Sequence, residues 1–176
     1  MESGLPNYQA VIDDALQLVY SQHHRLIGQL HPDSFRELTL DQLREGPLGR
    51  DLQRLAALAR RDTDEPKDSV LQAIDSVLQI LFWPVASEDY TVPRSFWDTE
   101  LGRMLALAKY HAYDRTELVS IGSAAQQLGV TRPTIYRWMD DRTLNYVRDD
   151  MTGRTFVVRR DIENLKQIAA DIAAEG

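Results

Sequence analysis

The chain has 176 residues, of which 43% are hydrophobic, and a formal net charge of −7; this composition excludes wholesale disorder and predicts a folded core. It has no cysteine, which excludes disulfides, thiolate zinc sites and a cysteine nucleophile. No apolar run approaches the roughly 20 residues of a membrane span, and MESGLPNYQA has no basic segment before an apolar run, so we expect a cytoplasmic protein without a signal peptide.

Residues 1–113 are predicted to form an all-helical domain. Apolar side chains recur at helical spacing in five segments, most of them bounded by proline: 8–30, 34–45, 48–61, 67–83 and 95–113. Ser34 and Glu37 have the spacing of a capping box and predict where the second helix begins, and Ser95 is the expected cap of the fifth. We expect this domain to mediate homodimerisation or to sense a small-molecule effector, whose identity the sequence leaves open.

Residues 114–176 are predicted to form a second domain of mixed character, with the polar stretch 114–117 as a linker. Two helical patterns fall within 120–140. Two β-rich runs then flank a turn that contains Gly153, which predicts a β-hairpin over 145–158. Asp161 is the expected cap of a last helix, whose apolar residues are Ile162, Leu165, Ile168 and Ile172.

The stretch SAAQQLGVTRPTIYRW, residues 123–138, meets the requirements of two helices that cross at a steep angle. Ala125 is small enough for a close crossing, and Gly129 suits a turn with positive φ. Thr131 is a good N-cap, and Pro133 falls in the first turn of the second helix, where the missing N–H costs little. The expected apolar seam consists of Ala124, Leu128, Val130, Ile135 and Trp138.

The longer run SIGSAAQQLGVTRPTIYRWMDDRTLNYVRDDMTGRTFVVRRDIENL resembles the winged helix-turn-helix of the MerR-like and phage-excisionase-like DNA-binding families, over about residues 118–166. The resemblance implies a mainly α protein: an N-terminal helical bundle followed by a winged helix-turn-helix with a small β-hairpin. It implies that Thr131–Met139 is the recognition helix and 145–158 the wing. Two positions depart from the family pattern. Gly122 and Ser123 stand where a glutamate is usual, and Arg142 stands where glycine often leads into the wing.

The expected DNA contacts lie on the second helix of the corner and around the hairpin. Residues 116–160 hold seven basic and five acidic side chains, and all seven basic ones are arginine, which suits phosphate and guanine. Ile135 and Trp138 are expected to face inward and the other side chains of the helix to face a groove. The candidate DNA-binding residues are Thr131, Arg132, Thr134, Tyr136, Arg137, Arg142, Arg148, Arg154, Arg159 and Arg160.

The function expected from these features is sequence-specific binding of double-stranded DNA by a transcriptional regulator acting as a homodimer. An excisionase-like architectural factor and a protein–protein interaction module remain alternatives, because fold alone does not give function. We find no catalytic constellation and no cofactor motif, so we expect neither an enzyme nor a bound cofactor. His23, His24 and His31 lack a completing carboxylate, so we expect exposed histidines rather than a metal site.

Overall fold

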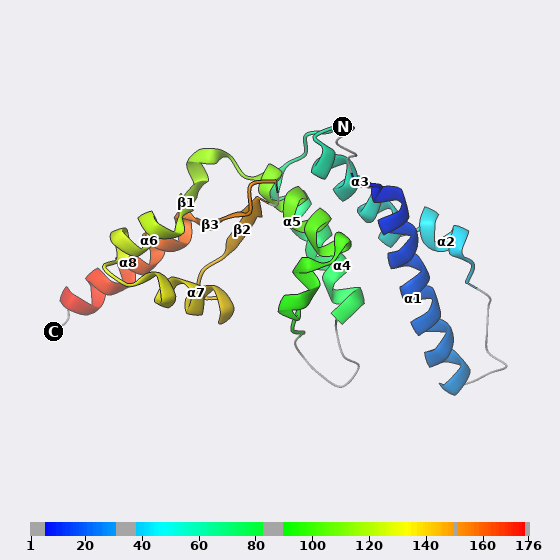
Figure 1. Ribbon diagram of the computed structural model, residues 1–176. Helices are drawn as coiled ribbons and strands as arrows, with labels where there is room; N and C mark the ends of the chain where they lie inside the picture. Colours follow the sequence, from blue (N-terminus) through cyan, green and yellow to red (C-terminus); the bar gives the residue numbers. More distant parts are fainter. Residues whose placement is uncertain (1–5, 31–37, 83–89, 150, 175–176) are drawn as a thin grey trace. The chain divides into compact units, whose positions relative to one another are not determined.

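The computed structural model describes residues 6–30, 38–82, 90–149 and 151–174 (Figure 1). Among these residues it is mainly helical, with a small three-stranded antiparallel sheet, which confirms the expected class. The α-helices are α1 (Tyr8–Leu30), α2 (Leu40–Glu45), α3 (Pro47–Arg60), α4 (Lys67–Phe82), α5 (Glu100–Ala112), α6 (Ile121–Leu128), α7 (Arg132–Asp140) and α8 (Arg159–Ala174). Two 3₁₀ turns, η2 (Arg94–Asp98) and η3 (Arg115–Glu117), and strands β1 (Leu118–Ser120), β2 (Tyr146–Asp149) and β3 (Arg154–Val158) complete the order.

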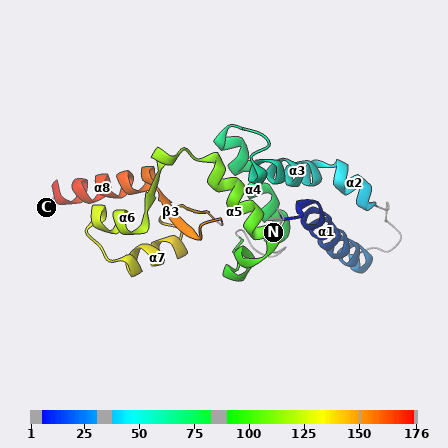
Figure 2. The ribbon, with the colours of Figure 1, turned by 45° about the horizontal axis from the view of Figure 1, so that its top comes forward.

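The chain divides into two compact units, residues 1–109 and 110–176. In unit 1, α1 packs against α2 and α3, and α3 packs against α4 (Figure 2). The apolar spacing that predicted these helices also marks their buried faces: Leu52 and Leu55 of α3 have no exposed surface, and Val70 and Val77 of α4 have at most 1% exposed. The fully buried stripe of α1 stops at Leu16. The apolar spacing continued to Leu30, but Leu26 on that stripe is 44% exposed.

Of three predicted helix caps, the first falls outside the described residues and the other two are wrong. Ser34 and Glu37 are the residues outside, and among the described residues Thr39 is the N-cap of α2, where its side chain and that of Gln42 form the capping box. Ser95 lies inside the turn η2, so it does not cap the fifth helix. Thr99 precedes that helix instead, and its Oγ1 accepts a hydrogen bond from the backbone N–H of Gly102 at 3.1 Å. Serine and threonine are both favoured caps, so the sequence alone does not decide between Ser95 and Thr99.

The third predicted cap is Asp161, which does not cap the last helix. Helix α8 begins two residues earlier, at Arg159, directly after β3. The Asp161 carboxylate accepts hydrogen bonds from the backbone N–H of Asn145 at 2.7 Å and from its side-chain amide at 3.0 Å. Asp161 therefore fixes the entry to the hairpin, 16 residues away in sequence.

Unit 2 is organised by a sheet with strand order β1-β3-β2. The hairpin β2–β3 was predicted, but β1 was not, because three residues are too few to show a strand period. Pairing of Leu118 with Val158 and of Ser120 with Phe156 places β1 on the open edge of β3. The predicted linker 114–117 is held in this unit, since Asp114 caps η3 and η3 packs against α8.

Helices α6, α7 and α8 pack on one face of this sheet around a single apolar cluster. Its fully buried members include Ala124 of α6, Ile135 of α7, Val157 of β3 and Ile162 of α8, each with no exposed surface. The C-terminal part of α8 extends beyond the cluster, and Ile168 and Ile172 are 55% and 68% exposed. Across the described ranges, no helix combines the length and apolarity that a membrane crossing requires.

Candidate nucleic-acid interface

The turn between α6 and α7 is closed by backbone hydrogen bonds. The backbone N–H of Val130 donates to the carbonyl of Ala125 at 3.0 Å, and that of Gly129 donates to the carbonyl of Gln126 at 3.3 Å. This is the Schellman pattern, which needs a left-handed residue just after the helix. Gly129 supplies it with φ 66°. The predicted need for glycine here is confirmed.

Helix α7 is held by three side chains on its inner face. Ile135 is fully buried, Met139 is 9% exposed, and Trp138 packs on the same cluster from its edge. Thr131 has the extended backbone of an N-cap, but its side chain makes no capping hydrogen bond. Its hydroxyl lies 3.0 Å from that of Thr134, so the two hydroxyls bond to each other. The cap position was predicted correctly, and the capping bond was not.

The outer face of α7 carries side chains that the core does not use. Arg132, Tyr136 and Arg137 are exposed, Tyr136 to 49%. No described residue forms an ion pair or a hydrogen bond with the guanidinium of Arg132 or Arg137. Helical spacing places Asp140 on the same side, so the basic character belongs to the N-terminal half of the helix.

Gly122, which departs from the family pattern, leaves room for Arg132. A Cβ built on Gly122 would lie 3.1 Å from one terminal nitrogen of the Arg132 guanidinium. The guanidinium therefore rests over the first turn of α6, beside the free backbone of this glycine. A side chain at position 122 would push it away, at little cost to the fold because the end of an arginine moves easily. A Cβ at position 122 would therefore require the Arg132 guanidinium to shift.

The chain leaves α7 through a strained residue. Arg142 has φ 60°, a conformation that costs a non-glycine residue roughly 1 kcal/mol. In the resembled family this position is often glycine, which adopts positive φ without strain. Two residues later the backbone N–H of Leu144 donates to the carbonyl of Trp138 at 2.9 Å, and the Leu144 side chain is 1% exposed. A buried leucine and a backbone bond hold the strained turn in place.

In the hairpin, Arg154 beside the turn is exposed, whereas Asp149 is buried. Arg154 begins β3 opposite Asp149 and is exposed, while Gly153 before it has φ 68°. Asp149 is 8% exposed, and its carboxylate accepts from the backbone N–H of Met151 at 3.1 Å and from the Thr152 hydroxyl at 2.5 Å. The hairpin turn itself surrounds this carboxylate.

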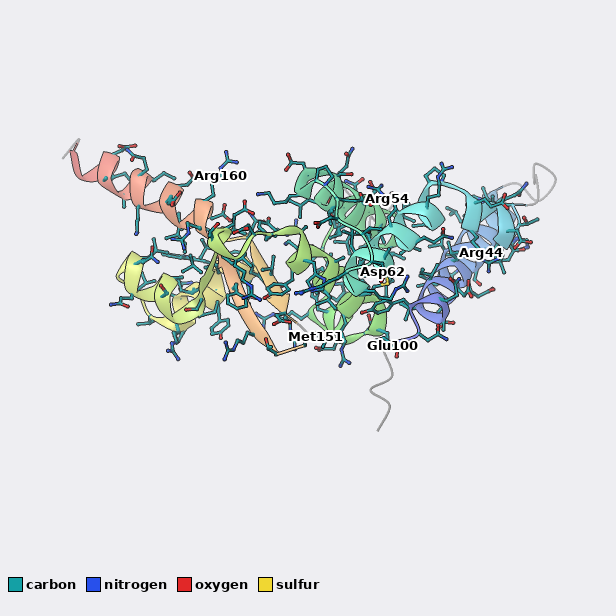
Figure 3. The ribbon with its side chains drawn as sticks, turned by 90° about the horizontal axis from the view of Figure 1, so that it is seen from above. Arg44, Arg54, Asp62, Glu100, Met151 and Arg160 are labelled. Carbon is teal, nitrogen blue, oxygen red and sulfur yellow. The ribbon has the colours of Figure 1, made fainter. Side chains whose placement is uncertain are left out.

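The remaining candidate arginines lie outside α7. Arg148 lies on β2 and is half-buried. The Nε of Arg159 donates to the backbone carbonyl of Thr116 at 2.6 Å, which ties α8 to η3. Arg160 projects from the first turn of α8 (Figure 3), exposed and without an ion pair to any described residue. The structure thus brings together Thr131, Arg132, Thr134, Tyr136 and Arg137 on α7, and it places Arg142, Arg148, Arg154, Arg159 and Arg160 elsewhere in unit 2.

Comparison with protein-family models, with curated proteins and with solved structures found no match to this chain. Within the described residues, no three side chains of histidine, cysteine, aspartate or glutamate are grouped as a metal site would require. His24 stacks on Tyr20 with ring centroids 5.5 Å apart, and His31 lies outside the described residues. The interpretation of unit 2 therefore rests on its own geometry.

Proposed function

We propose that this protein binds double-stranded DNA sequence-specifically as a transcriptional regulator. In this proposal unit 2 is a winged helix-turn-helix, α7 is its recognition helix and the hairpin over 145–158 is its wing. The outer face of α7 carries the proposal: two arginines that no described residue pairs stand beside an exposed tyrosine, on a helix whose other face is packed in a core. A rigid helix with free arginines suits the major groove, where arginine reads guanine by two hydrogen bonds.

The roles within the interface follow from position along α7. Arg132, in the first turn, is best placed to reach base edges, because the N-terminal residues of a recognition helix enter the groove first. The hydroxyls of Thr131, Thr134 and Tyr136 suit phosphate contacts that fix the register. Arg154 at the hairpin turn suits the backbone or the minor groove. The small excess of positive charge over 116–160 predicts weak nonspecific binding and dependence on these few contacts.

Selection of bound fragments from random duplexes by the full-length protein, followed by fluorescence anisotropy on the selected site, tests the proposal. Arg132→Ala is expected to weaken binding to the selected site by about 10- to 100-fold, the effect of one lost bidentate base contact. Arg115→Ala, also exposed and also in unit 2, is the matched control and should change affinity by less than about twofold. Equal losses in the two variants would mean that α7 is not the reading face.

A salt series separates DNA binding from the interaction-module alternative. Duplex affinity should fall steeply between about 50 and 200 mM salt, because each phosphate contact releases counterions. Absence of duplex binding at the lower salt concentration would contradict the proposal and leave α7 as a surface for another protein. A strong bend in the bound duplex together with low sequence selectivity would favour the excisionase-like architectural role.

We also propose that unit 1 pairs two copies, because one small reading helix covers only a half-site. The second half of α1 exposes Leu18 and Leu26, an apolar surface that the described part of unit 1 leaves uncovered. Leu18→Asp is expected to convert a dimer to a monomer in analytical ultracentrifugation. Ile172→Asp is the matched control, since Ile172 of α8 is at least as exposed. A monomeric parent chain, or dissociation by the control alone, would contradict pairing through α1.

A further inference from the structure

The sheet of unit 2 has a second face, turned away from α6, α7 and α8. Side chains alternate along a strand, so paired residues of the three strands share a face. Val119, Val157 and Tyr146 pair across the strands and belong to the apolar cluster under the helices. The opposite face therefore carries Leu118, Val147, Asp149, Arg154, Phe156 and Val158, and we call it the far face.

A hollow of about 310 Å³ opens on the far face. It is lined by Leu118, Asp149, Arg154 and Phe156 of the strands, by Thr152 of the hairpin turn, and by Tyr110 and Arg115. The Phe156 ring stacks with that of Tyr110, with centroids 6.0 Å apart and planes at 22°. Its volume is at the lower end of the range for small-molecule sites.

Two guanidinium groups at the rim of this hollow have no internal partner. Arg115 and Arg154 are exposed, and no described residue forms an ion pair or a hydrogen bond with either guanidinium. The one lining carboxylate, that of Asp149, is 92% buried, and both of its oxygens accept hydrogen bonds from the hairpin turn. The groups in the hollow that can still bind a ligand are therefore two positively charged guanidiniums. They lie beside the stacked rings of Phe156 and Tyr110.

We propose that this hollow binds a small molecule that joins an oxyanion, such as a phosphate group, to a flat apolar ring. The two guanidiniums would each donate charge-assisted hydrogen bonds to the oxyanion. Phe156 and Tyr110 give the ring an apolar wall. This site does not depend on DNA binding by α7, because the hollow lies on the sheet face that α6, α7 and α8 do not cover. It shares only Arg154 with the proposed DNA contacts.

A duplex fits the hollow less well than a small molecule does. DNA presents its phosphates on a convex surface and keeps its bases stacked. The aromatic rings inside the hollow would therefore add nothing to the affinity for a duplex. A phosphate contact with a duplex would need only exposed arginines. Phe156 and Tyr110 therefore favour a ligand that enters the hollow.

Phenyl phosphate, inorganic phosphate and phenol are suitable probes, titrated into the full-length protein and followed by amide chemical shifts and calorimetry. Phenyl phosphate should shift the amides of Leu118, Thr152, Arg154 and Phe156 and leave those of α7 unchanged. It should bind about 3- to 10-fold more tightly than inorganic phosphate, the effect of one aromatic contact, whereas phenol should bind too weakly to detect.

Arg115→Ala and Arg154→Ala should each weaken phenyl phosphate binding by about tenfold or more, and Arg154→Lys by less than Arg154→Ala. Arg25→Ala, an exposed arginine of unit 1, is the charge-matched control and should bind as the parent does. Both arginines of the hollow are exposed, so these variants should fold, and unchanged α7 amide shifts verify that. Failure of phenyl phosphate to shift the far-face amides, or equal weakening by Arg25→Ala, would overturn the proposal.

Competition with a short duplex decides between the two sources of phosphate. If a duplex displaces phenyl phosphate, and Arg115→Ala weakens duplex binding as much as Arg132→Ala does, the hollow belongs to a DNA surface and the small-molecule assignment is wrong. If phenyl phosphate binds normally in the Arg132→Ala variant and stays bound in the presence of duplex, the small-molecule site stands, whether or not the protein binds DNA.

Discussion

The two units use the same side chain, arginine, in different ways. In unit 1, Arg54 lies among Asp51, Glu65 and Ser69, with Nη1 3.0 Å from an Asp51 oxygen and Nε 3.2 Å from a Glu65 oxygen. Arg44 likewise bridges α1 and α2 through Asp13 and Asp41 (Figure 3). In unit 2, five exposed arginines form neither an ion pair nor a hydrogen bond through the guanidinium with any described residue: Arg115, Arg132, Arg137, Arg154 and Arg160. In unit 1, Arg25 and Arg50 are also exposed and form no ion pair with a described residue.

Pairing with a carboxylate separates the arginines that stabilise the fold from those that are available to a ligand. A guanidinium held by two carboxylates has little left to offer an external anion, because its donors and its charge are already used. An exposed guanidinium without such a partner keeps its hydrogen-bond donors and its charge for an external anion. Helix α7 differs from the rest of this acidic chain because Arg132 and Arg137 stand on the outer face of a helix whose inner face is packed in a core.

The largest expected effects come from the two separate cores. Leu52→Ala in unit 1 and Ile135→Ala in unit 2 each delete a side chain with no exposed surface, and each should lower the unfolding free energy of its own unit by about 2–5 kcal/mol. Hydrogen exchange resolved by residue should show the loss in one unit only. A loss of protection in both units would mean that they unfold together, and it would contradict the view that each unit has its own core.

Removal of one structural and one free arginine should have unequal effects on stability. Arg54→Ala should cost about 1 kcal/mol of unfolding free energy, a modest figure because the side chain is 39% exposed and water screens the pair. Arg137→Ala, the matched change on α7, should stay within about 0.5 kcal/mol. Urea denaturation measures both. If Arg137→Ala costs as much as Arg54→Ala, then Arg137 serves the fold.

Gly122→Ala should separate stability from recognition within unit 2. Alanine at this first-turn position should raise the stability of unit 2 by up to about 0.5 kcal/mol, since glycine is the poorer helix former. The new Cβ would displace the Arg132 guanidinium, so affinity for the selected duplex should change although the fold is stronger. Thermal denaturation and anisotropy on the same variant test this. Unchanged duplex affinity would show that the resting position of Arg132 does not matter.

The smallest expected effect is a pH dependence in unit 1. The hydrogen bond from Arg54 lowers the pKa of Glu65 below its usual range, in spite of partial burial. The folded state therefore gains stability above the unfolded pKa of about 4.3 and loses it as the pH falls through the lower folded pKa. Urea midpoints between about pH 6 and pH 3 should fall less in Glu65→Gln than in the parent. An identical decline would mean that this pair contributes nothing to acid sensitivity.

Local residue choices were enough to predict the helical corner of unit 2. Gly129 had to adopt positive φ, Thr131 had to stand before a helix, and Ile135 had to face inward, because each requirement involves neighbours within a few residues. The same holds for the hairpin turn at Gly153. Most helix bounds in unit 1 followed from apolar spacing and from proline breaks for the same reason.

Only the tertiary structure decided the features that join distant segments. Strand β1 exists because Leu118 meets Val158, 40 residues later, and Asp161 holds Asn145 rather than its own helix start. Phe156 meets Tyr110 only because the sheet brings them together, so the hollow between them has no sequence signal. Sequence by itself thus determined the local backbone and the inward faces, since these depend on short-range sterics and periodicity. Folding decided which arginines found a carboxylate and which were left for a ligand.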